Sequence, residues 1–204
     1  MNLRCNTRSL VFVGFSILVG CATSVEVPPE TQAGLVDLRD QLESGKAQIQ
    51  RTTNSARDLT QRPQAQIVPQ IERLARDIQT LREMAAKGRE SFEQRQGQSL
   101  QYFTHWESQL KGMSDSVREA GEERHSKSIA SFKTLQDDVT SLRETFRPYM
   151  AALSEAELYL RTDTTAAGVK TITPRIEEAL SVENSLMKKM DVVSAQIDSM
   201  RGSK

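Results

Sequence analysis

The chain has 204 residues, which suits a single domain of moderate size. Lys plus Arg and Asp plus Glu number 27 each, so no net charge favours binding to nucleic acid or to an anionic lipid surface. Aromatic residues make up only 5%, which is low for a compact globule and typical of long helices that pack along narrow apolar seams.

Residues 1–20 have the layout of a secretory signal peptide. Arg4 and Arg8 make the start basic, and an apolar run follows from Leu10 to Val19. A helix of this length spans about 15 Å, roughly half of a bilayer core. The run is therefore too short for a permanent transmembrane helix.

The apolar run ends in Leu18-Val19-Gly20-Cys21, which resembles the lipobox of bacterial lipoproteins. The resemblance implies cleavage between Gly20 and Cys21, a diacylglyceryl group on the Cys21 thiol and acylation of the new amino group. Several acyl chains anchor a protein to a membrane, since each buried methylene contributes ~0.8 kcal/mol. By resemblance to Gram-negative lipoproteins, Ala22 in place of Asp implies the outer membrane, facing the periplasm. The alternative is an ordinary thiol behind a generic signal peptide.

Removal of residues 1–20 takes Cys5 with it and leaves Cys21 as the single cysteine. With Cys21 alkylated, the mature chain has no disulfide and no thiol for catalysis or metal binding. Residues 21–31 are expected to be a flexible tether, because Pro28-Pro29 favours an extended spacer. Residues 32–204 then form a helical coiled-coil domain.

The first two helical stretches are predicted at 32–61 and from 68 or 69 to about 111. Their apolar residues recur at steps of three and four, the spacing of a helix seam. Pro63 and Pro69 mark the break between the two stretches. The second seam slips near residues 94–98 and resumes through Phe103, Trp106, Leu110, Met113 and Val117. Gly112 and Ser114 predict a turn, although a continuous helix was the alternative.

The third stretch, about 116–161, has the most regular seam, running from Phe132 to Leu160. Pro148 lies inside it and predicts a kink or a short interruption. Residues 162–165 predict a capped turn, and a last helix follows to about Met200, with a possible restart at Thr173-Pro174. The fold class is thus all-α: an elongated antiparallel bundle, or coiled-coil hairpins, of about four long helices.

Catalytic, cofactor-binding and metal-binding residues are not predicted. Glu122-x-x-His125 is a single Glu-x-x-His pair, whereas a di-iron bundle needs two pairs and two further Glu residues. Three pairs of acids are adjacent in sequence, so their side chains point about 100° apart and form solvated faces rather than catalytic dyads. These pairs are Glu122-Glu123, Asp137-Asp138 and Glu177-Glu178. Tyr102, Phe103 and Trp106 are predicted to pack in the core rather than to form a binding platform.

From about Gln70 to Met200 the chain resembles a proteobacterial family of helix-rich envelope proteins of unknown function. The resemblance rests on Tyr102-Phe103-x-x-Trp106-Glu107-x-x-Leu110 and on Leu158-Tyr159-Leu160-Arg161, with Met150 and Leu153 between them. It implies no catalytic residues.

The favoured function is a non-enzymatic envelope lipoprotein that acts as a spacer, scaffold or adaptor. Its partners are expected to be the membrane, through Cys21, and an envelope protein or a second copy, without nucleic acid or cofactor. One alternative is a periplasmic carrier of a lipid or another apolar ligand, which the narrow seams disfavour. Another is a peptidoglycan-linked tether joined through Lys204, by resemblance to the short outer-membrane lipoprotein of enteric bacteria that ends in a wall-linked lysine.

Overall fold

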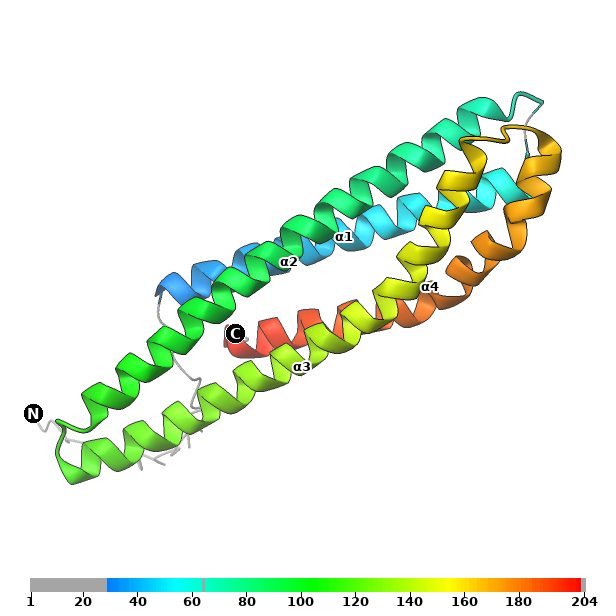
Figure 1. Cartoon of the computed structure of the whole chain (residues 1–204). Coiled ribbons are helices and arrows are strands. Elements are labelled where there is room, and N and C mark those ends of the chain that lie inside the picture. Colours follow the sequence, from blue (N-terminus) through cyan, green and yellow to red (C-terminus); the bar gives the residue numbers. More distant parts are fainter. Residues whose placement is uncertain (1–28, 64, 203–204) are drawn as a thin grey trace, which may run out of the picture.

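Four long helices form the protein in a computed structural model that describes residues 29–63 and 65–202 (Figure 1). They are α1 (Pro29–Gln61), α2 (Val68–Leu110), α3 (Asp115–Leu160) and α4 (Ala166–Met200). Successive helices run in opposite directions along one elongated rod (Figure 1). The described residues contain no strand, and the predicted all-α antiparallel bundle is confirmed.

The helix boundaries follow the local chemistry of proline and threonine. Helix α1 begins at Pro29, three residues before the predicted start, because the first position of a helix needs no N–H donor. Pro69 likewise lies in the first turn of α2, so it opens that helix. At the start of α4, the Thr165 side chain accepts a hydrogen bond from the Gly168 N–H at 3.1 Å, which confirms the predicted capped turn.

Both internal prolines lie within continuous helices. Helix α3 passes through Pro148 and α4 passes through Pro174. The predicted restart at Thr173 is wrong: its hydroxyl donates to the Val169 carbonyl at 2.8 Å, as a residue inside a helix does. Helix α3 changes direction in its C-terminal half, where Pro148 removes one backbone donor (Figure 1).

The core lies between all four helices and is formed by the predicted seams. The largest fully buried apolar side chains include Leu59, Leu74, Leu153, Ile176 and Leu186. Each helix packs against two neighbours around a ring, and α3 and α4 share the most extensive contact. The diagonal pairs α1–α3 and α2–α4 do not approach at the backbone level, so long side chains must fill the centre.

A buried polar layer joins α1 to α2. The Gln48 amide donates to the Asp77 carbonyl at 3.0 Å, and the Ser55 hydroxyl donates to the Asp77 carboxylate at 2.5 Å. Gln48 and Thr52 are buried beside one another. Polar groups inside a bundle need partners at defined positions, so this layer favours one register between the two helices.

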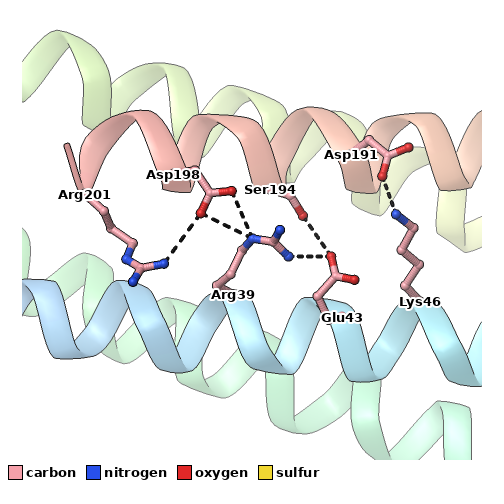
Figure 2. Close-up of polar contacts among 7 residues, drawn as sticks. All are labelled: Arg39, Glu43, Lys46, Asp191, Ser194, Asp198 and Arg201. Carbon is pink, nitrogen blue, oxygen red and sulfur yellow. Dashed lines mark hydrogen bonds and ion pairs between the residues drawn. The ribbon is translucent and has the colours of Figure 1, made fainter. Parts of the chain in front are cut away.

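Ion pairs close the bundle between the first and the last helix (Figure 2). Arg39 of α1 contacts Asp198 of α4 at 3.3 Å and also pairs with Glu43 on its own helix. Lys46 of α1 pairs with Asp191 of α4. These contacts lie along one side of α1 (Figure 2), and they hold α4 in place beside it.

Candidate functional site

The α2–α3 hairpin projects beyond the other two helices. Arg95 of α2 pairs with Asp37 of α1, and Asp37 is eight residues after the start of α1. Because the two helices are antiparallel, residues 103–110 of α2 extend past α1 by about 12 Å. The Gln196 amide of α4 donates to the Ser131 carbonyl of α3 at 3.0 Å, so α3 begins well beyond the end of α4 as well. Residues 100–129, which include this projecting part, are called the tip below.

The tip lies at the same end of the rod as the start of α1 and the end of α4 (Figure 1). This placement follows from the even number of antiparallel helices. The turn at residues 111–114 is the most distant described part of that end (Figure 1).

An aromatic cluster holds the two helices of the tip together. The Phe103 ring lies 5.8 Å from the Phe132 ring across the hairpin, and the Trp106 ring lies 5.2 Å from the His125 ring. The Tyr102 ring lies 5.7 Å from the Trp106 ring at a tilt of 48°, and burial raises the pKa of Tyr102. Phe103 and Trp106 thus pack between helices as predicted, but both stay half-buried because α1 and α4 end before they can cover them.

His125 is held by its neighbours in the tip. Its Nε2 atom lies 3.0 Å from the Phe103 carbonyl oxygen, and its ring meets Phe103 and Trp106 edge-on. Glu122, one turn earlier, lies 3.8 Å from Arg118. Within the described residues no three His, Cys, Asp or Glu side chains are placed to share a metal ion. The geometry gives His125 a packing role.

Several large apolar side chains are exposed on the tip. Leu100, Met113, Val117 and Ile129 are 56%, 42%, 53% and 40% exposed. The predicted continuation of the seam through Met113 and Val117 is therefore wrong, because no third helix among the described residues reaches that level. Leu100 and Ile129 line an open groove whose floor includes Phe103 and Phe132. Four of the eight large apolar side chains that are exposed in the described residues thus lie in the tip, two of them at the turn and two at the groove, and this concentration at one end marks a candidate contact site.

Charges on the tip are paired locally and nearly cancel. Lys111 lies 3.2 Å from Glu107, Arg118 lies 2.6 Å from Asp115, and Lys127 lies 2.6 Å from Glu123. All these pairs join residues three or four positions apart on one helix. The tip thus offers neither a basic nor an acidic face, and its apolar side chains are what distinguish it.

The adjacent acids lie on solvated surfaces, as predicted. Five of the six are exposed, and Asp138 is half-buried. Glu178 pairs with Arg175, which also contacts Glu155.

Sequence reasoning missed a buried carboxylate, Glu157. Its side chain is only 5% exposed and lies 2.9 Å from Arg82 and 2.5 Å from Arg161. Burial raises the pKa of Glu157, but the hydrogen bonds from the two arginines outweigh burial and hold the pKa below its ordinary value. Glu157 follows the seam residue Ala156 directly, and this position beside the seam is the feature of the sequence that could have indicated its burial. Its role is to join α2 to α3 at the end opposite the tip.

Gly20, Cys21 and Lys204 lie outside the described residues, so their predicted roles stay predictions. Among the helices that the structure describes, none has both the length and the apolar character needed to cross a bilayer.

A family model described as a protein of unknown function, DUF2959, matches residues 34–200. No curated protein and no solved structure shows significant similarity to the chain. The matched range contains most of α1 and all of α2, α3 and α4.

Proposed function

Since the chain belongs to the DUF2959 family of proteins of unknown function, we propose a function from its own residues. It is a lipid-anchored protein of the cell envelope, attached through Cys21, whose rod acts as a non-enzymatic spacer, scaffold or adaptor. It faces the periplasm from the outer membrane, and its partner is another envelope protein or a second copy.

The observation that carries the proposal is Leu18-Val19-Gly20-Cys21 behind a short apolar run and a basic start. The position of the helical rod supports it. Helix α1 begins at Pro29, so seven residues separate the proposed anchor from the folded part. An anchor so close to a rod about 65 Å long suits a protein that holds something at a distance from a membrane.

Fatty-acid labelling in growing bacteria tests the anchor. The wild-type chain is expected to incorporate an alkyne-tagged fatty acid and to sediment with membranes, whereas Cys21→Ser loses both properties. Cys5→Ser is the matched control, because Cys5 lies in the segment removed before acylation is complete. Equal labelling of Cys21→Ser and wild type contradicts the proposal.

Membrane fractionation tests the location. The wild-type chain is expected in the outer-membrane fraction, and Ala22→Asp is expected to move it to the inner-membrane fraction. A wild-type chain found in the inner membrane contradicts the outer-membrane assignment and leaves the lipid anchor standing.

A further inference from the structure

We propose that the tip contacts the lipid surface to which Cys21 is attached, so that the rod touches its membrane at two points. The inference rests on the proposed function, because it requires an anchor at Cys21. It adds a second membrane site, made of Met113 and Val117 at the turn with Tyr102 and Trp106 behind them.

The length of the chain between Cys21 and Pro29 sets how far the rod can stand from the lipid. Seven residues separate them, which allows at most about 28 Å even when fully extended. Residues 103–110 of α2 run about 12 Å past the start of α1 in the direction that Figure 1 shows. A tether extended to less than half of its length therefore brings the tip to the membrane.

The exposed side chains of the tip suit a lipid surface better than a protein groove. Met113 and Val117 lie at the turn, whereas Leu100 lies 11 residues before it on α2 and Ile129 lies 15 residues after it on α3. A protein groove would cover one side of the projecting end. A lipid surface that the end enters can cover apolar side chains on all of its sides at once. Tyr102 and Trp106, half-buried behind the turn, are the residue types that collect at membrane–water interfaces.

The charges favour an electrically neutral lipid surface. The tip carries four Lys or Arg and five Asp or Glu residues, and most of them are paired with one another. Such a surface has no excess of positive charge to attract anionic headgroups. Contact is expected with zwitterionic phosphatidylcholine and is expected not to depend on salt.

Trp106 is the single tryptophan of the chain, so its fluorescence reports on the tip alone. The full chain is made in bacteria, labelled with a tagged fatty acid, purified in detergent and reconstituted into phosphatidylcholine vesicles with brominated acyl chains. We expect the bromine atoms to quench the fluorescence of Trp106. We also expect the Trp106 emission to lie at shorter wavelength than in the same protein kept in detergent without vesicles.

Two double variants separate the tip from general surface effects. Met113→Asp with Val117→Asp is expected to lose the quenching while it keeps the fatty-acid label and the helical circular dichroism spectrum. Leu158→Asp with Val192→Asp changes two exposed residues away from the tip, which are 68% and 51% exposed against 42% and 53% for Met113 and Val117, and this variant is expected to be quenched like wild type.

Each other outcome overturns the inference in a distinguishable way. A labelled, vesicle-bound chain whose Trp106 is not quenched shows that the tip stands clear of the lipid, and the proposed function survives. A chain without the fatty-acid label overturns both proposals. An emission shift that grows with protein concentration in the absence of lipid shows that a second copy covers the tip, and lipid contact is then rejected.

Discussion

The hydroxyl oxygen of Tyr149 on α3 lies 3.1 Å from the hydroxyl oxygen of Thr53 on α1, across the centre of the bundle. Both side chains are fully buried, and the Tyr149 hydroxyl also donates to the Ile49 carbonyl at 3.5 Å. These contacts join two diagonal helices whose backbones do not meet. They also satisfy polar groups that burial would otherwise leave without partners.

Removal of either hydroxyl is expected to destabilise the fold. Tyr149→Phe and Thr53→Val each keep the shape of the side chain and should each lower the free energy of unfolding by about 1–2 kcal/mol. The double variant should cost less than the sum of the two, because the partner left unpaired by one change is removed by the other. Urea unfolding measures all three values. Additive costs would show that the two hydroxyls do not interact.

Tyr149 also predicts a loss of stability at alkaline pH. Burial raises its pKa from 10.0 to about 12, so the unfolded chain releases this proton first. The stability from neutral Tyr149 is complete below pH 10 and is lost between about pH 10 and 12, by about 1.4 kcal/mol per pH unit. Denaturant unfolding across this range should show a steeper decline for wild type than for Tyr149→Phe. Parallel curves would contradict the assignment.

Glu157 predicts a loss of stability on the acid side. Its pKa in the folded chain lies below the ordinary value of 4.5, so its contribution is complete above pH 4.5 and disappears as the pH falls through the lowered pKa. Glu157→Gln should cost about 1–3 kcal/mol at neutral pH and flatten that part of the profile. Glu155→Gln, on the exposed side of the same helix turn, is the control and should cost at most about 1 kcal/mol. Equal losses of stability from Glu157→Gln and Glu155→Gln would mean that burial of Glu157 does not strengthen its ion pairs.

The ion pair between Lys46 of α1 and Asp191 of α4 predicts that exchanging the two charges restores stability. Lys46→Glu places a second carboxylate beside Asp191 and should lower the melting temperature. Lys46→Glu with Asp191→Lys restores opposite charges and should recover most of the loss, although an exposed pair contributes only about 0–1 kcal/mol. The loss should also shrink in high salt. Failure of the double variant to recover would show that the side chains do not meet in solution.

Two helical glycines predict opposite responses to alanine. A methyl group at Gly88 meets no atom within 4 Å, so Gly88→Ala should stabilise α2 by about 1 kcal/mol. A methyl group at Gly168 would lie 2.5 Å from the Asp163 carbonyl oxygen, so Gly168→Ala should push the α3–α4 turn apart and destabilise the chain. Thermal unfolding compares the two. Stabilisation by both substitutions would contradict the close approach at Gly168.

The helices could be predicted from the sequence because the residues that start and end helices agree with the apolar periodicity between them. Ser114 and Thr165 precede α3 and α4 as predicted, although only Thr165 makes a capping hydrogen bond through its side chain. The seam from Phe132 to Leu160 lies along the core face of α3. Local chemistry decides both features: a side-chain oxygen or a proline favours a helix start, and apolar spacing selects a face.

The extent of burial could not be predicted, because it depends on where neighbouring helices end. Met113 and Val117 continue the spacing of the seam and are nevertheless exposed. Phe146 lies on the seam but is half-buried. Arg143, which the spacing places off the seam, puts its guanidinium carbon 5.3 Å from the centre of the Phe92 ring and covers it. Partners on other helices decide such contacts, and one helix's periodicity contains no information about them.

Each of the four helices is unbroken, so the number of its residues sets its length directly. Each heptad adds about 10 Å, and seven residues make almost two full turns, so removing seven from every helix at one level leaves the seams nearly aligned. The length of the rod can therefore be changed in steps of seven residues while the apolar seams keep facing one another. A gap-spanning protein should lose activity in steps with such cuts and regain it when the same residues are returned.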